Sequence, residues 1–453
     1  MGVSALSANT TGTANTALGR AALEDNTTGN SNTAIGYQSL DTNTTANDNT
    51  AVGYRSLRAN TGGANTAVGH RALEANTTGE QNTALGQRAG YQITTGENNS
   101  CHGWNAGGSI TNASRCTAVG NRAYDAANND DNTAVGYSSL SSNCGAENTA
   151  LGSQALLTNT GTNNTGVGFK ALLYNSSGTH NVAVGNETLR SNTTAGYNTG
   201  VGAAALYANT TGDSNTAVGY GALNNNTTAS NNTAVGRSAL LVNETGSNNC
   251  SMGQNSMAAN TTGSNNVAIG LNALNANTTA DDNVAVGRNA LDTNTTGAGS
   301  VAVGYYALSK ATTANSNTAV GRYAGAEFTT ADAQVAVGAY ALSTNVTGTH
   351  NCCIGYYAGK DISNGTYNVA VGSYAGCADQ NGTADGHRNV SIGYEAGKLI
   401  DTGNDNACVG YQAMKNLTTG HQNTVMGKTT GDEITTGDNN LMLGFAAGSC
   451  SSP

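Results

Sequence analysis

The sequence predicts an all-β fold, a parallel β-solenoid (β-roll or β-helix) of about 27 coils. Three observations support this prediction. A unit of 17 residues recurs along the chain, each unit holds one short run of β-forming residues, and small residues dominate, with 61 Gly and one Pro among 453 residues. Disordered chains are usually rich in Pro, Lys and Glu, whereas only 10% of these residues are charged. We therefore expect an ordered array.

Each repeat contains the phrase Asn-Thr-Ala-Val-Gly, and its glycine serves here as the anchor, position 0. Anchors run from Gly2 to Gly444 at a spacing of 17, with four spacings of 16 and one of 21. Thr-Ala-Val at −3 to −1 predicts a short strand, and Asn-Thr-Thr-Gly at +7 to +10 predicts a turn. One coil per repeat follows, with neighbouring coils hydrogen-bonded ~4.8 Å apart. The chain, residues 1–453, is therefore expected to be a single continuous solenoid domain.

The strand positions predict which side of the coil is buried. Side chains alternate along a strand, so −1 and −2 point to opposite faces. Position −1 is aliphatic in every repeat except one, which has His102, and we expect it to face the core. Positions −2 and 0 are Ala and Gly with few exceptions, which predicts close approach of another backbone. The simplest source is further copies of the chain in an intertwined or packed homotrimer; a thin single solenoid with nearly touching walls is the alternative.

Two positions exchange their large apolar residue. Most repeats have Leu at +4 and Asn at +7, as in Leu40 with Asn43. Where +4 is Gly, +7 turns apolar, as in Gly90 with Ile93. Because interiors are close-packed, we interpret +4 and +7 as alternative fillers of one core space.

Position −4 is Asn in 23 of 26 repeats, with Cys116, Ser300 and Gln334 as the exceptions. Stacked Asn side chains can form a hydrogen-bonded ladder along a solenoid. We expect a structural ladder of these side chains, represented by Asn32, Asn49, Asn65, Asn82, Asn132, Asn215, Asn232 and Asn266.

Reactive side chains are too scattered to predict a catalytic or metal site. The six His are not at ligand spacing, and none of the nine Cys forms a Cys-x-x-Cys pair. We expect five cysteines at −2 or −3 to be core residues: Cys101, Cys250, Cys352, Cys353 and Cys408. No Ser/His/Asp set or phosphate-binding loop is suggested, so we expect no enzymatic activity, no cofactor and no metal. The net charge of −10 disfavours binding to nucleic acid. The sequence contains no run of 18 apolar residues, so we expect no membrane insertion.

Two departures from the repeat are candidate surface contacts. The 21-residue spacing indicates a four-residue insertion within 373–392, and insertions in solenoids map to surface loops, which makes His387 and Arg388 candidates. The only Trp, Trp104, is the second candidate, together with Tyr305 and Tyr356 from a row of tyrosines at +1 and +2. Such a row suits either a sugar or partner surface or rim packing between chains.

The repeat Asn-x-Ala-Val/Ile-Gly followed by x-x-Ala resembles the head repeats of trimeric autotransporter adhesins. The longer form, with Asn-Thr-Thr-Gly, looks like repeats of phage tail fibre proteins. The resemblance spans Gly2 to Gly444 and implies a left-handed β-roll of three chains together. It also implies a structural fibre or adhesive shaft, tail-fibre-like, that is extracellular or on a virion surface and supports attachment to a host glycan or receptor.

Two other functions stay open. Uncapped solenoid ends would allow head-to-tail polymerisation into an extracellular filament. A regular Thr array could instead bind ice; this interpretation ranks last, because −3 is expected to share the core-facing side with −1.

Overall fold

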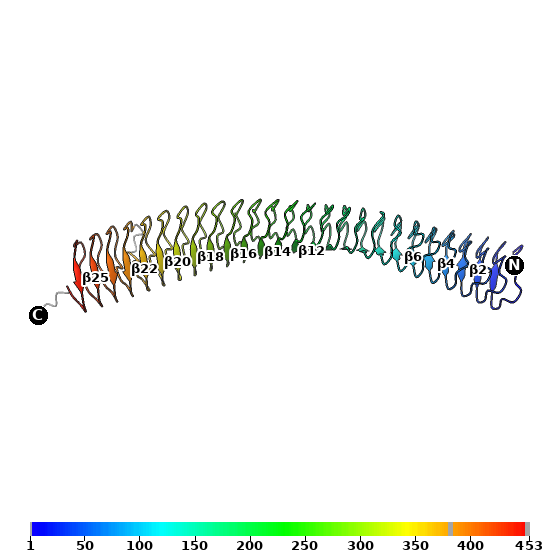
Figure 1. Cartoon of the computed structure of the whole chain (residues 1–453), viewed down its shortest axis with the longest axis horizontal. Helices are drawn as coiled ribbons and strands as arrows, with labels where there is room; N and C mark the ends of the chain where they lie inside the picture. The colour runs from blue at the N-terminus through cyan, green and yellow to red at the C-terminus, as the bar shows by residue number, and fades with distance from the viewer. Residues whose placement is uncertain (1, 379–383, 449–453) are drawn as a thin grey trace. The chain divides into compact units, whose positions relative to one another are not determined.

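The computed structural model describes residues 2–378 and 384–448 and confirms an all-β parallel β-solenoid with one coil per 17-residue repeat. It divides into two compact units, Met1–Thr228 and Ala229–Pro453, each taken by itself below. In each unit, three-residue strands stack in parallel along one side of the coils (Figure 1). No α-helix occurs within the described ranges.

The first unit holds 13 strands among its described residues, one fewer than its predicted repeats, because the coil of Gly2 carries none. They are β1 (Thr16–Leu18), β2 (Thr33–Ile35), β3 (Thr50–Val52), β4 (Thr66–Val68), β5 (Thr83–Leu85), β6 (Ser100–His102), β7 (Thr117–Val119), β8 (Thr133–Val135), β9 (Thr149–Leu151), β10 (Thr165–Val167), β11 (Val182–Val184), β12 (Thr199–Val201) and β13 (Thr216–Val218).

The second unit also holds 13 strands among its described residues. They are β14 (Thr233–Val235), β15 (Cys250–Met252), β16 (Val267–Ile269), β17 (Val284–Val286), β18 (Val301–Val303), β19 (Thr318–Val320), β20 (Val335–Val337), β21 (Cys352–Ile354), β22 (Val369–Val371), β23 (Val390–Ile392), β24 (Ala407–Val409), β25 (Thr424–Met426) and β26 (Leu441–Leu443).

Equivalent repeat positions pair between coils. Within each unit every strand pairs in parallel with the next, for example Val284 opposite Val301 and Val286 opposite Val303. The turns pair in the same way, since the Thr27 N–H donates to the Thr44 carbonyl at 2.8 Å. Register is therefore set by the repeat, and each position becomes a column along the unit.

Left-handed backbone at fixed positions closes each coil. In the coil of Gly36, φ is +53° at Gln38, +51° at Leu40 and +61° at Asp48. β-branched residues are strongly disfavoured at such φ values. This explains why +4 is Leu, Met, Tyr or Gly and never Val or Ile, although Ile is common at +7.

The anchor glycines lie against the next coil of the same chain. At Gly287, φ is +131°, and a Cβ would lie 2.5 Å from the carbonyl oxygen of Gly304. The predicted close approach of another backbone is therefore present, but that backbone belongs to the following coil. A second chain is not needed to explain the small residues.

The predicted orientation of the strands is wrong. Position −2 points into the core and −1 points outward: Ala34 is fully buried, whereas Ile35 is 36% exposed. The physical reason is the narrow interior, because a Cβ on Gly166 at −2 would already lie 3.2 Å from Cγ of Leu156 on the facing wall. Beside a leucine at +4 only a methyl-sized side chain fits at −2, so the thin solenoid with close walls is the correct description of each unit.

The exchange between +4 and +7 is confirmed. Ile93 is fully buried, and a Cβ on Gly90 would lie 3.0 Å from its Cδ1 and 2.8 Å from Cδ2 of Leu73. Position −2 takes part as well, since a Cβ on Gly107 would lie 2.5 Å from Sγ of Cys101. Cys101, which is larger than Ala, is thus accommodated by Gly at +4 of its own repeat.

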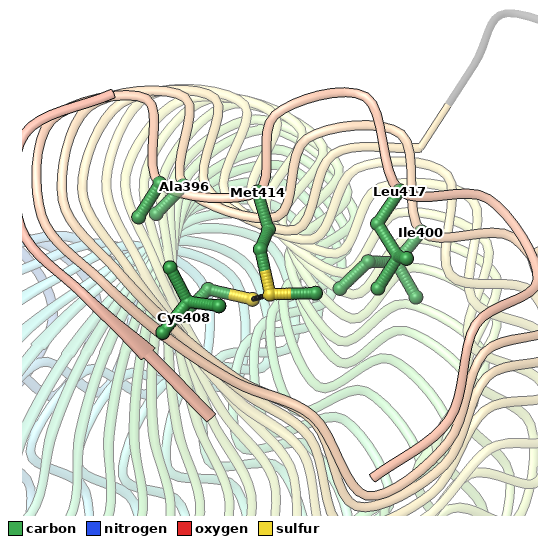
Figure 2. Packing of buried hydrophobic residues seen from close by; sticks show 7 residues of the cluster. Ala396, Ile400, Cys408, Met414 and Leu417 are labelled. Atoms are coloured by element: carbon green, nitrogen blue, oxygen red, sulfur yellow. Dashed lines mark hydrogen bonds between the residues drawn. The ribbon is translucent and has the colours of Figure 1, made fainter. Parts of the chain in front are cut away.

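Figure 2 shows how these positions fill the interior near the C-terminal end of the second unit. Met414 at +4 and Cys408 at −2 point toward one another, with their sulfur atoms 3.7 Å apart. Ile400 and Leu417, both at +7, lie beside them. The core at this place is built from residues at +3, +4, +7 and −2, which lie side by side inside the coils.

In the coil of Gly372 the described residues include no large apolar side chain at +4. Gly376 occupies +4, and the +7 residue of that repeat, Asp379, lies outside the described residues. A cavity of about 20 Å³ is bordered by Gly376, Ile362 and Ile400. A Cβ on Gly376 would meet nothing closer than Ala370 Cβ at 3.3 Å.

We expect Gly376→Leu to raise the free energy of unfolding by about 1 kcal/mol, measured by urea denaturation. Its φ of +53° matches the φ of Leu residues at +4, such as Leu342 at +48°, so the backbone already suits leucine. The side chain would enter the cavity and bury apolar surface.

Gly325→Leu is the matched control, because the same position is filled there. A Cβ on Gly325 would lie 2.9 Å from both Leu308 Cδ2 and Phe328 Cε2. We expect this substitution to destabilise by about 2 kcal/mol. Two changes of the same sign would contradict the exchange between +4 and +7.

The Asn column at −4 forms hydrogen bonds between coils. The Asn49 N–H donates to Oδ1 of Asn32 at 3.0 Å, and Nδ2 of Asn49 donates to the Gly62 carbonyl at 3.0 Å. The exceptions largely keep the pattern, since Oγ of Ser300 and Oε1 of Gln334 accept the next N–H at 3.2 and 3.1 Å. The eight predicted ladder residues are all fully buried: Asn32, Asn49, Asn65, Asn82, Asn132, Asn215, Asn232 and Asn266.

A second Asn ladder runs along +7. Nδ2 of Asn43 donates to Oδ1 of Asn26 at 3.0 Å, and the column continues in the following coils that keep Asn there. From the sequence, +7 was expected only to fill core space. The asparagine therefore satisfies buried polar groups in addition to occupying volume.

Candidate association face

The outward side chains of the strands form two columns, at −3 and −1, on the face of each unit's sheet. Paired strands bring equivalent residues into line, as with Val267 opposite Val284 and Ile269 opposite Val286. Ile269 is 39% exposed, because its neighbours in the column cover the rest of its surface. The result is a continuous apolar column at −1 on the outside of each unit, broken only by His102 in the first.

The two units differ at −3. In the first unit −3 is Thr in 11 of 13 strands, with Ser100 and Val182 as exceptions. In the second unit it is Thr in three of 13 strands, and six of the others have Val. The first unit therefore presents a hydroxyl column beside an aliphatic one, whereas the second presents two largely apolar columns.

The outward threonine hydroxyls are open to solvent. Thr66 and Thr83, like the other −3 threonines, make no side-chain hydrogen bond to any residue that the structure describes. The turn threonines behave differently, since Oγ1 of Thr77 donates to the Thr94 carbonyl at 2.9 Å. The −3 hydroxyls therefore depend on water or on another molecule for their partners.

Aromatic side chains at +1 flank the −1 column. The predicted contacts Trp104, Tyr305 and Tyr356 are 40%, 38% and 47% exposed. The guanidinium of Arg122 lies 5.1 Å from the Trp104 ring centre, and that of Arg322 lies 5.9 Å from the Tyr305 ring centre. Exposed aromatic residues with arginine beside them are typical of protein interfaces.

Five tyrosines at +2 stack into a ladder in the second unit. Ring centres from coil to coil are 5.5, 5.3, 5.0 and 5.4 Å apart along Tyr306, Tyr323, Tyr340, Tyr357 and Tyr374. An open hollow of about 400 Å³ beside the ladder is lined in part by Tyr357, Tyr374, Lys360 and Lys398. Their spacing of 17 in consecutive repeats shows that these tyrosines are neighbours, whereas the stacking of their rings is a finding of the structure.

His387 and Arg388 lie on turn columns and are tied to neighbouring coils. Nδ1 of His387 accepts a hydrogen bond from the Thr366 N–H at 3.0 Å. Nε and Nη2 of Arg388 donate to the two carboxylate oxygens of Asp405 at 2.6 and 3.0 Å. The five predicted surface contacts therefore do not converge on one site, although all except His387 are exposed.

Cysteines occupy both sides of the strands. Cys101, Cys353 and Cys408 at −2 are buried as predicted; burial raises the pKa of Cys101 and Cys408 to about 12 and raises that of Cys353 as well. Cys250 and Cys352 at −3 were expected in the core, and this is wrong, since −3 faces outward. These two thiols lie on the outer face of the second unit.

Two carboxylates are held in ion pairs at the edge of the coils. Glu74 is buried, pairs with Arg71, and lies 3.5 Å from Nε of Arg58. Although burial opposes ionisation, hydrogen bonds from Lys398 and other donors lower the pKa of Glu395 to about 2. Both carboxylates are paired with cationic side chains, which suits a structural role rather than proton transfer.

Among the residues that the structure describes, no group of three or more His, Cys, Asp or Glu side chains is arranged to hold a metal ion. The described ranges also contain no helix that is long and apolar enough to cross a membrane. Comparison with models of known families finds no match, and comparison with curated proteins finds no relative.

Proposed function

We propose that this protein is a structural fibre or adhesive shaft, tail-fibre-like, whose chains pack side by side as a homotrimer at a cell or virion surface. The observation that carries the proposal is the outward aliphatic column at −1, present in both units. Residues of this column such as Val286, Val303 and Val320 expose apolar surface that packing against another chain would remove from water. The number three comes from the resemblance to trimeric adhesin heads.

Hydrogen bonding along the coils supports the mechanical part of the proposal. Strands, turns and the Asn ladders at −4 and +7 all bond coil to coil, so load along a unit is shared by several columns. Each coil contacts mainly its neighbours, as in other solenoids. Adding repeats of this kind lengthens a solenoid without changing the local structure of its coils.

Sedimentation velocity and light scattering on the intact chain test the proposal. We expect a particle of three times the mass of one chain at micromolar concentration, and discrete rods in electron micrographs. A monomer at all concentrations would contradict side-by-side packing. Open-ended filaments would instead favour head-to-tail polymerisation.

The tyrosines of the second unit support the attachment part of the proposal. The hollow between Lys360, Lys398, Tyr357 and Tyr374 combines aromatic surface with polar groups, as ligand sites commonly do. We expect it to contribute to binding of a host surface glycan. Loss of cell or glycan binding on Tyr357→Ala, with unchanged particle mass, is the supporting result, and unchanged binding would remove this hollow from the proposal.

Ice binding is a second candidate, because the outward orientation of −3 removes the reason for ranking it last. In the first unit Thr50, Thr66 and Thr83 repeat a hydroxyl beside an aliphatic group at each coil step. Thermal hysteresis of the intact protein, abolished by Thr66→Lys, is the expected result. An inactive wild-type protein would exclude this candidate.

A further inference from the structure

We propose that self-association is confined to the second unit, whose outer strand face packs against the same face of the other copies of this chain, while the first unit's face stays in water. This inference rests on the proposed side-by-side packing and adds which part of the chain carries it. The difference lies at −3, which is mainly Thr in the first unit and mainly aliphatic in the second.

The apolar face of the second unit is large enough for an interface. Thirteen strands stacked ~4.8 Å apart extend over roughly 60 Å, and a three-residue strand is roughly 10 Å wide. The face is therefore roughly 600 Å² before the flanking +1 side chains are added, at the upper end of the largest patches on typical monomers. Stable complexes bury ~800 Å² per partner, which the face with its +1 flank approaches.

The chemistry of the face indicates what covers it. Its −3 and −1 columns hold no charged residue, and its +1 flank includes Tyr305, Tyr356, Arg288 and Arg322. Apolar centres bordered by Tyr and Arg are typical of protein interfaces. A partner must also match columns whose residues repeat at every coil. The same face of another copy has the same spacing, because its sequence is identical. A second copy is therefore the occupant that fits.

The outer face of the first unit is poorly suited to the same packing. Eleven of its 13 strands would bury a −3 hydroxyl, and these hydroxyls have no partner among the described residues. Burying a hydroxyl without a hydrogen bond is unfavourable. The face with Thr66 and Thr83 is therefore expected to keep its water.

Matched sets of Val→Thr substitutions in the full-length chain test the inference. The test set is placed at −3 of the second unit: Val267→Thr, Val284→Thr, Val301→Thr and Val335→Thr. The control set is placed at outward −1 positions of the first unit: Val52→Thr, Val68→Thr, Val119→Thr and Val135→Thr. Both sets exchange four outward methyl groups for hydroxyls, and Thr is already native at −3 in Thr233 and Thr318.

Sedimentation analysis across a concentration series provides the first readout. We expect the test set to raise the dissociation constant by about 100-fold or more and the control set to change it less than about threefold. Equal weakening by the two sets, or no weakening by the test set while the wild type associates, would overturn the inference and leave the proposed fibre function standing. A monomeric wild type would overturn both.

Native thiols on the face provide a second readout that does not depend on mass. Cys250 and Cys352 lie at −3 of the second unit, whereas Cys101 and Cys408 are buried in the core. Maleimide labelling followed by mass spectrometry should show slow labelling of Cys250 and Cys352 in the wild type. In the test set we expect the labelling rate of both thiols to be at least tenfold higher. Unchanged slow labelling of Cys101 and Cys408 shows that the variant is folded. Fast labelling of Cys250 and Cys352 in the associated wild type would place the interface elsewhere.

Discussion

Replacing a single anchor glycine, in Gly287→Ala, is expected to destabilise the second unit by about 4 kcal/mol or more. Gly287 has a φ of +131°, a region that residues with a Cβ rarely adopt, and its Cβ would lie 2.5 Å from the Gly304 carbonyl oxygen. Both groups are backbone, so no side chain can move aside and β17 must separate from β18. We expect a lower urea midpoint and faster amide hydrogen exchange in these two strands.

Gly299→Asn is the matched control, in a turn between the same two strands. Gly299 has a φ of +67°, and the nearest atom to its Cβ would be Oγ of Ser316 at 3.9 Å. Other coils carry asparagine in this conformation, such as Asn265 at +61°. We expect a change within about 0.5 kcal/mol. If Gly287→Ala were equally mild, the close contact between anchors of successive coils would be refuted.

The repeat made much of this fold predictable. A constant spacing of Gly, Asn and Thr determines register, because coils can stack only with equivalent positions in line. Some repeats have a pair such as Leu40 and Asn43, and others have a pair such as Gly90 and Ile93. This alternation also indicated packing, because a constant total side-chain volume is a property of protein interiors. These predictions depended on patterns across repeats, and the structure confirms them.

The orientation of the strands was not predictable from hydrophobicity alone. Larger apolar residues are usually buried, so Val at −1 was expected inside and Ala at −2 outside. In a coil this narrow, Leu at +4 already fills the space opposite −2, which leaves room at −2 for no more than a methyl group. A signal was present: +4 avoids Val and Ile in every repeat, which indicates a left-handed backbone that turns this leucine inward.

The candidate face followed from the corrected orientation. Once −3 and −1 face outward, the change from Thr66 and Thr83 to Val267 and Val284 becomes a change of surface rather than of core. The same correction moves Cys250 and Cys352 from the interior to the outer face. Stacking of the +2 tyrosines required coordinates, because spacing shows that the rings are neighbours but not how they lie.

Removing one rung of the −4 ladder, in Asn266→Ala, is expected to destabilise the second unit by about 3 kcal/mol, measured by urea denaturation. Asn266 is fully buried; its Oδ1 accepts from the Asn283 N–H at 2.9 Å, and its Nδ2 donates to the Ala280 carbonyl at 2.8 Å. Alanine leaves both backbone groups without this partner inside the coil, and each such group costs about 1–3 kcal/mol. Amide exchange at Asn283 should accelerate most.

Asn266→Gln separates the loss of hydrogen bonds from the loss of the asparagine itself. Gln334 occupies the same column naturally, where its Oε1 accepts from the Asn351 N–H at 3.1 Å and its Nε2 donates to the Gly348 carbonyl. Glutamine can therefore restore both bonds at position 266, and we expect it to recover more than half of the stability that alanine loses. If glutamine and alanine were equally destabilising, side-chain volume rather than hydrogen bonding would account for the ladder. Equal stability of all three proteins would show instead that the coils hold their register through the backbone and the +7 column alone.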